Sequence, residues 1–152
     1  MVLYHYTSQE SLTQIITSKL FYPSYLNPQM DTAYGEGWYF TDLKPDTTPD
    51  EDLQQSIWMR PEPLKCRGYI AVEIDDSLLE NCRHHVYRVK SDAVPNKVID
   101  LSITYTFIST GKQAIRYITQ GRKQIVHKQY NTFKTLGIIV LIGLLLWALS
   151  RS

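Results

Sequence analysis

The sequence predicts an α+β fold in which a small mixed or antiparallel sheet is followed by a C-terminal transmembrane helix. Several short apolar or alternating runs, each bounded by turn residues, indicate strands. The two helical patterns of the domain both lie early in the chain, which argues against a doubly wound parallel sheet. The third observation is an uncharged run over residues 135–150. We therefore expect one domain over 1–108, a basic juxtamembrane helix or linker over 109–133 and an anchor over 134–150.

The opening unit is predicted to be a strand, a turn and a helix. Val2–Tyr6 has the apolar and aromatic composition of a strand. Thr7 and Glu10 then have the spacing of a capping box, in which a hydroxyl and a carboxylate satisfy free backbone amides at a helix start. Apolar residues recur at helical spacing from Leu12 up to Lys19.

A long loop and a second strand and helix are expected next. Residues 23–37 are rich in Pro, Asn, Asp, Tyr and Gly without apolar periodicity, which is typical of a surface loop that carries function. Trp38–Thr41 is predicted to be a strand. Thr48 followed by Pro49 favours a capped helix start with proline at the first helical position, and the helix is expected to run to Trp58.

The remaining strands are predicted from alternation and from turn residues. Gly68–Ile74 alternates in the manner of a strand with one buried face. Val86–Val89 and Lys97–Ile103 are the next two expected strands, with the second continuing through Tyr105–Phe107. The polar segment Lys90–Asn96 between them is predicted to be a turn.

The run over 135–150 predicts a tail anchor. At about 1.5 Å per residue a helix of this length covers about 24 Å, against a hydrocarbon core of roughly 30 Å. Lys134 and Arg151 at its ends can reach the headgroups, and Trp147 suits an interface. Because basic residues concentrate before the run, we expect a single-pass protein with its N-terminal domain facing the cytosol. The alternative is a buried core helix.

Composition and cysteine spacing limit which other classes of function are expected. The chain has 16 basic and 15 acidic residues, so its net charge of +1 gives no global signature of nucleic-acid binding. The basic residues before the anchor can contact anionic lipid headgroups for roughly 1 kcal/mol each. Cys66 and Cys82 lack zinc-ligand spacing, and His84 and His85 beside Cys82 lack a second ligand pair, so no metal site is expected.

Two segments contain the main candidate site residues. LYHYT at 3–7 places a histidine in a short strand before a capped helix, and GEGWYFTD at 35–42 places a tyrosine in a strand after a glycine-hinged loop. With VEID at 72–75 and VIDLS at 98–102, these segments resemble the ADP-ribosyltransferase domains with an HYD signature. Such domains are small relatives of the diphtheria-toxin and poly-ADP-ribose polymerase branch. The resemblance covers roughly 2–103.

The resemblance implies an ADP-ribosyltransferase-like domain that uses NAD as its substrate. In that pattern His5 would hydrogen-bond the ribose hydroxyls on the adenosine side, and Tyr39 would stack on the nicotinamide. Asp100 would be the third residue of the signature, after the histidine and the tyrosine; the better-known relatives carry a glutamate there. Its carboxylate would hold the 2′-hydroxyl of the nicotinamide ribose and stabilise the developing positive charge. Asp42 and Asp75 are competitors for this role. The residues expected to contact NAD come from the two matching segments: His5, Tyr6, Thr7, Gly37 and Tyr39.

The residue types suit the reaction that the resemblance implies. Nicotinamide leaves through an oxocarbenium-like transition state, which calls for positioning and electrostatic stabilisation more than for a strong nucleophile. Each residue also has a purely structural interpretation. His5 is one strand histidine, Tyr39 is one of eleven tyrosines, Gly35 and Gly37 suit a tight turn, and Asp42 suits a turn cap.

The sequence therefore predicts a membrane-anchored, NAD-dependent ADP-ribosyltransferase. The acceptor is a protein side chain, a nucleic acid, a small molecule, or water, in which case the enzyme is an NAD glycohydrolase. One alternative is a catalytically inactive module that binds NAD, ADP-ribose or a protein partner at a membrane. Another is a membrane adaptor without a nucleotide site, for which His5 and Tyr39 would lie far apart or would be buried away from any cleft.

Overall fold

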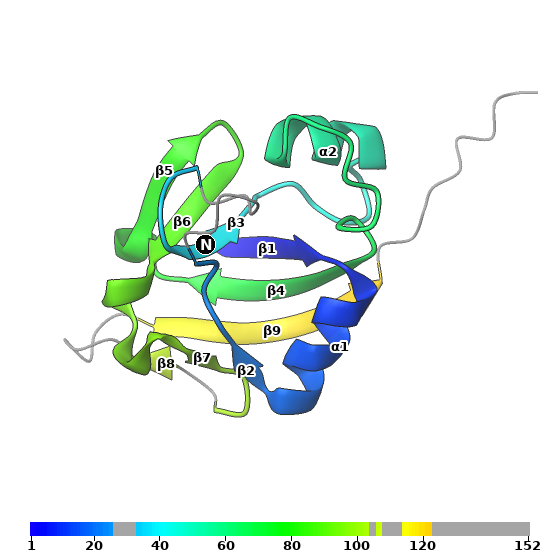
Figure 1. The fold of residues 1–152 in the computed structure, drawn as a ribbon. Helices are drawn as coiled ribbons and strands as arrows, with labels where there is room; N and C mark the ends of the chain where they lie inside the picture. Colours follow the sequence, from blue (N-terminus) through cyan, green and yellow to red (C-terminus); the bar gives the residue numbers. More distant parts are fainter. Residues whose placement is uncertain (26–32, 104–105, 108–113, 123–152) are drawn as a thin grey trace, which may run out of the picture.

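The computed structural model describes residues 1–25, 33–103, 106–107 and 114–122. Over these residues the chain forms antiparallel sheets and two α-helices, so the predicted α+β class is confirmed (Figure 1). Every strand pair that the structure describes is antiparallel, which selects the antiparallel form of the two sheet types expected.

Three sheets are present in the described part of the chain. The largest has the strand order β1-β4-β9-β8. Its strands are Val2–Thr7 (β1), Gly68–Ile74 (β4), Ala114–Arg122 (β9) and Thr106–Phe107 (β8). The second sheet has the order β3-β6-β5, with Gly37–Phe40 (β3), Val86–Lys90 (β6) and Leu79–Arg83 (β5). The third pairs Leu20–Phe21 (β2) with Ile99–Asp100 (β7).

Helix α1 is Gln9–Ser18, and its start differs by one residue from the prediction. Ser8 is the N-cap, because its hydroxyl accepts a hydrogen bond from the backbone N–H of Ser11 at 3.1 Å. Thr7 is not the cap, since it remains in strand β1. The helix ends before Lys19, which adopts a left-handed conformation with φ of 62°.

Helix α2 is Asp50–Ile57 and follows Pro49, which occupies the N-cap position without a side-chain hydrogen bond. The predicted cap at Thr48 with proline inside the helix is therefore wrong by one residue. Three acidic residues in the first turn favour this helix start, because they interact with the positive end of the helix dipole. Short 3₁₀ helices connect later strands over Asp76–Leu78, Ser91–Ala93 and Pro95–Lys97.

The predicted basic helix or linker over 109–133 is wrong for Ala114–Arg122, which form strand β9 along β4. Ile115 is 1% exposed and belongs to the core, while Arg116 lies opposite Glu73 and pairs with its carboxylate. Burial of the apolar side chain and neutralisation of the basic one stabilise a strand here. The sheet therefore extends past residue 108, the boundary expected for the domain.

The strand predicted over Lys97–Ile103 is much shorter in the structure. Only Ile99–Asp100 pairs, with Leu20–Phe21 of β2, and Lys97 lies in a 3₁₀ helix. Strands β2 and β5 have no counterpart among the predictions. The strands expected from Val2, Trp38, Gly68 and Val86 are confirmed with ends shifted by at most one residue.

Two apolar clusters pack on β1. The larger one joins α1, β3, β4, β6 and β9 through Leu3, Leu12, Trp38, Phe40, Ile70, Val72, Val89 and Ile115, among others. The smaller one lies under α2 and contains Tyr6, Leu53 and Cys66. Strand β1 is thus held between two cores while it forms one edge of its sheet (Figure 1).

Within the described residues, no helix is long and apolar enough to cross a membrane. The run over 135–150, on which the anchor prediction depends, lies outside the described residues.

Candidate active site

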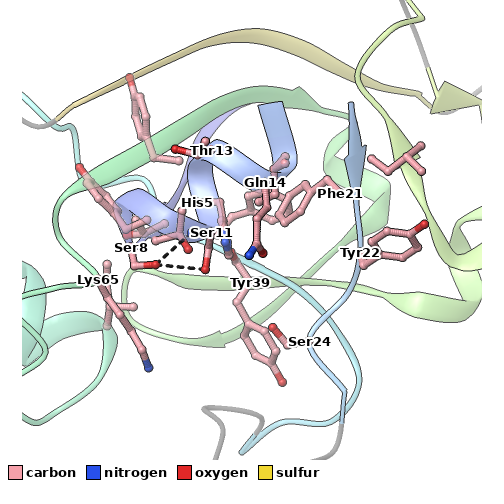
Figure 2. Close-up of a pocket in the computed structure, with 18 of the residues that line it drawn as sticks. His5, Ser8, Ser11, Thr13, Gln14, Phe21, Tyr22, Ser24, Tyr39 and Lys65 are labelled. Carbon is pink, nitrogen blue, oxygen red and sulfur yellow. Dashed lines mark hydrogen bonds between the residues drawn. The ribbon is translucent and has the colours of Figure 1, made fainter. Parts of the chain in front are cut away.

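A cleft with a volume of about 870 Å³ opens where β1 and β3 separate. Among the described residues one bridge joins Tyr4 of β1 to Thr41, the residue that follows β3, with hydrogen bonds from Tyr4 N–H to Thr41 O at 2.8 Å and from Thr41 N–H to Tyr4 O at 2.9 Å. Beyond this bridge, the described residues of β1 and β3 form no further ladder pair. Helix α1, the end of β2, the end of α2 with Ile57 and Trp58, and Lys65 also line the cleft (Figure 2). The volume suits a small-molecule ligand, for which pockets of roughly 300–1,000 Å³ are typical.

His5 lies on β1 in the wall of the cleft, and its tautomer follows from its partner. Its Nδ1 lies 2.9 Å from the backbone oxygen of Tyr39. Because a carbonyl only accepts, Nδ1 carries the proton and donates it, and the neutral ring keeps Nε2 as an acceptor. The rings of Phe21 and Phe40 contact the imidazole at centroid distances of 4.8 Å and 6.2 Å. His5 is therefore an oriented hydrogen-bond acceptor.

Burial lowers the pKa of His5 below its ordinary value of 6.5, and the hydrogen bond to Tyr39 opposes this shift only in part. The stability of the protein should then depend on pH below neutrality. As the pH falls below about 6.5, the unfolded chain binds a proton at His5 while the folded chain does not, so the free energy of unfolding decreases until the pH passes the lowered pKa. Urea unfolding between pH 7.5 and 5 checks this.

The matched variant for this measurement is His5→Gln, which cannot titrate. We expect its free energy of unfolding to fall less steeply than that of the wild type below pH of about 6.5. Equal slopes for the two proteins would show that His5 has the same pKa in the folded and unfolded chains.

Tyr39 faces the same cleft from β3, and its hydroxyl donates to the backbone oxygen of Gly35. Burial raises the pKa of Tyr39, against the opposing effect of Arg88, so the phenol stays protonated and able to donate at neutral pH. Gly35 has φ of +103°, which side chains rarely adopt, so glycine is required for the turn that receives this hydrogen bond.

Gly37, predicted to contact NAD, does not line the cleft. It pairs instead with Ser24, through hydrogen bonds of 2.8 Å and 3.2 Å between their backbones. Its φ is +157°, and a Cβ at this position would overlap the backbone oxygen of Val89. The absence of a side chain at Gly37 therefore allows β3 to pack closely against β6.

Tyr6 and Thr7, the other two residues expected to contact NAD, line the cleft. The side chain of Tyr6 is buried and its hydroxyl donates to the oxygen of Leu43 at 3.0 Å. Its backbone is the more informative part. In an antiparallel strand, the backbone groups of every second residue point toward the same edge. The N–H and C=O of Tyr4 point toward Thr41, so those of Tyr6 point toward the same edge of β1, beyond the Tyr4–Thr41 bridge. A donor and an acceptor are thus presented next to His5.

The structure does not place Asp100 in the cleft wall. Its Oδ1 accepts hydrogen bonds from the N–H of Ser102 at 2.8 Å and from the hydroxyl of Ser102 at 2.6 Å, and these bonds lower the pKa of Asp100. Asp100 lies opposite Leu20, a cleft residue, in the β2–β7 pair. His5 and Tyr39 are brought together, whereas Asp100 caps a turn.

The two competing aspartates are also engaged elsewhere. Asp42 accepts from Tyr87 at 3.3 Å and lies 2.6 Å from Nδ1 of His85. Asp75 caps the 3₁₀ helix that follows it, through the N–H and the hydroxyl of Ser77. No carboxylate lines the cleft in the part of the chain that the structure describes. Nor do three or more metal-ligating side chains gather anywhere in that part.

Two kinds of site residue lie outside the sequence predictions. Phe21 and Phe40 hold the imidazole in place, as described above. Ser11 and Gln14 of α1 present polar side chains to the cleft (Figure 2). Their spacing of three residues places them on one helix face, a signal available from the sequence once the helix is recognised.

One of three comparisons with known proteins found a match. A family model described as a HYD1 signature containing ADP-ribosyltransferase matches residues 3–102. The matched range includes His5, Tyr39 and Asp100. None of the curated proteins and none of the solved structures in the comparison matches the chain.

Proposed function

The chain belongs to the ADP-ribosyltransferases that contain the HYD1 signature, and on that premise we propose that it is an NAD-dependent enzyme whose cleft binds NAD as substrate. The bond between C1′ of the ribose and the nicotinamide nitrogen breaks, and nicotinamide leaves with the electron pair. A nucleophile of the acceptor then attacks C1′ and loses its proton. The acceptor is a protein side chain, a nucleic acid, a small molecule or water.

The observation that carries the proposal is that His5 and Tyr39 contact each other and line one cleft. Nε2 of the neutral imidazole can accept a hydrogen bond from a ribose hydroxyl. The ring of Tyr39 offers an aromatic surface on which nicotinamide can stack. The N–H and C=O of Tyr6, which point toward the edge of β1 beyond the Tyr4–Thr41 bridge, match the acceptor and donor of the nicotinamide carboxamide. These groups would hold NAD while its glycosidic bond breaks.

A second function is favoured by one observation, namely that the described cleft residues include no carboxylate. A carboxylate near the ribose would stabilise the positive charge that develops as nicotinamide leaves. Without one, the same cleft would bind NAD or ADP-ribose without cleaving it, and the protein would act as a binding module.

The experiment that separates these functions measures NAD binding and nicotinamide release by the purified 152-residue chain in detergent. If the protein is an enzyme, both NAD binding and nicotinamide release are expected. The variant Asp100→Asn tests whether Asp100 is the third residue of the site. If Asp100 completes the site, the variant should bind NAD as the wild type does but release nicotinamide at least about a hundredfold more slowly. Asp75→Asn is the matched control, because it also removes a carboxylate that caps a turn through a serine.

Each other outcome has a definite meaning. Slower release by Asp75→Asn with unchanged release by Asp100→Asn would assign the role to Asp75. Unchanged release by both variants would transfer the role to Asp42, which Asp42→Asn then tests. Binding by the wild type without release would establish the binding module. Absence of both would contradict the proposed function.

We also propose that the run over 135–150 holds the domain at the cytosolic face of a membrane, with the possible acceptors thereby concentrated near that surface. Its lack of charge between Lys134 and Arg151 supports this proposal. The full chain should remain in the membrane fraction after alkaline carbonate extraction, while a chain ending at Asn131 should not. Release of both chains by carbonate would contradict the anchor.

A further inference from the structure

Three side chains form a row across the second sheet, starting at the cleft. Tyr39 of β3 lies directly opposite Arg88 of β6, and Arg88 lies directly opposite Glu80 of β5. Directly opposed residues of an antiparallel sheet project their side chains on the same face. The neighbours of Tyr39 in β3, Trp38 and Phe40, point the other way into the core. The row therefore lies on the face of the sheet opposite to Trp38 and Phe40, and Tyr39 is its member that lines the cleft.

Arg88 is the central member of this row and is buried, with 8% of its surface exposed. Its Nε donates to Oε2 of Glu80 at 2.8 Å, and its Nη2 donates to the same oxygen. The side chain of Glu80 is 44% exposed, so the pair joins a buried guanidinium to a carboxylate at the surface. A buried guanidinium that lost this partner would be left without its compensating charge.

The stem and head of Arg88 pack on the glycine turn that precedes Tyr39. A Cβ on Gly35 would overlap Nη1 of Arg88, and a Cβ on Gly37 would lie 3.0 Å and 3.2 Å from its Cγ and Cδ. The same Gly35 receives the hydrogen bond from the Tyr39 hydroxyl. The turn is thus held between Arg88 on one side and the phenol of Tyr39 on the other.

We propose that the Glu80–Arg88 ion pair is a positioning device that fixes the Gly35–Gly37 turn and, through it, the ring of Tyr39 at the wall of the cleft. This inference rests on the proposed function, in which that ring stacks on nicotinamide. Backbone hydrogen bonds between β3 and β6 already fix the position of strand β3. The ion pair therefore determines the conformation of the turn and the orientation of the Tyr39 ring, and not the pairing of the strands.

The charges of the pair add a second effect. The nicotinamide ring of NAD is positively charged before cleavage, and an unpaired guanidinium beside Tyr39 would repel it. Glu80 neutralises Arg88 and removes this repulsion. Loss of Glu80 alone should therefore weaken NAD binding more than loss of both charges together.

The test is a double-mutant cycle of Glu80→Gln, Arg88→Gln and the double variant, in the full chain in detergent. We expect Glu80→Gln to raise KM for NAD by about tenfold with a smaller change in kcat, below the roughly hundredfold cost of a displacement of about 1 Å. The double variant should recover part of that loss in KM. Arg88→Met removes the charge and keeps an unbranched apolar stem, and it replaces Arg88→Gln in the cycle if that variant does not fold.

The control is Glu73→Gln, which breaks a second directly opposed Glu–Arg pair, Glu73 with Arg116 on β4 and β9. A second readout does not require NAD. NMR spectra of the chain with ¹³C-labelled tyrosine, with the Tyr39 signals identified by Tyr39→Phe, should show those signals shifted by Glu80→Gln and unmoved by Glu73→Gln.

The two readouts separate this proposal from the proposed function. Shifted Tyr39 signals in a protein that neither binds nor cleaves NAD would contradict the proposed function and keep the positioning role. Unmoved Tyr39 signals, or a KM for Glu80→Gln equal to that of Glu73→Gln, would overturn the positioning role.

Discussion

Replacement of His5 by alanine is expected to lower kcat/KM for nicotinamide release by about a hundredfold or more, which corresponds to about 2.7 kcal/mol of lost transition-state stabilisation. The substitution removes the acceptor Nε2 of a histidine that lines the cleft. It also leaves the carbonyl of Tyr39 without its donor and opens a space between Phe21 and Phe40. Steady-state kinetics with NAD measure the effect.

The control for this prediction is His84→Ala, which removes an exposed histidine on the β5–β6 hairpin. It should retain the wild-type kcat/KM. Thermal unfolding of both variants confirms that they are folded before their kinetics are compared. A folded His5→Ala protein with kcat/KM within about twofold of the wild type would show that the imidazole has no role in binding or catalysis.

The parts of the fold that were predictable from the sequence are those with local periodicity. Strand β4 alternates with Ile70, Val72 and Ile74 on its buried face, and helix α1 buries Leu12. Burial of these side chains stabilises the same local structure that the pattern favours. The positions of His5 and Tyr39 opposite each other were anticipated only through the family resemblance, because nothing local relates residues 34 positions apart.

The elements that were missed depend on long-range pairing. Strand β9 carries Arg116 and Arg122, and its basic character suggested a juxtamembrane helix. It becomes a strand because β4 offers it a partner. Strand β5 is an edge strand with exposed residues, so it has no apolar alternation to reveal it. Glu80 and Arg88 could not be related to Tyr39 before the register of β3, β6 and β5 was known.

The prediction that Asp100 belongs to the site shows a different limit of reasoning from sequence. A motif gives the residue type and its place in the chain, but not the direction of its carboxylate. The two-residue strand β7 ends at Asp100, and the chain turns at once so that Ser102 donates both its N–H and its hydroxyl to that carboxylate. Aspartate followed two residues later by serine has a strong tendency to form such a turn. Local turn chemistry thus competes with a role at the site.

Tyr39→Ala and Tyr39→Phe should separate the two roles of this side chain. We expect the alanine variant to lose about a hundredfold in kcat/KM for nicotinamide release, because the stacking surface is removed and the ring no longer fixes the substrate. The phenylalanine variant keeps the ring and loses only the hydrogen bond to Gly35, so a loss of about tenfold at most is expected, from a bond worth about 0.5–1.5 kcal/mol.

The comparison requires a tyrosine that is exposed but does not line the cleft, and Tyr25, 52% exposed, is suitable. Tyr25→Ala should retain wild-type kinetics. If Tyr39→Phe lost as much as Tyr39→Ala, the hydroxyl and the Gly35 turn, rather than the aromatic surface, would be the feature on which catalysis depends. If both Tyr39 variants matched Tyr25→Ala, nicotinamide would not stack on this ring, and the binding site for NAD would have to lie on another wall of the cleft.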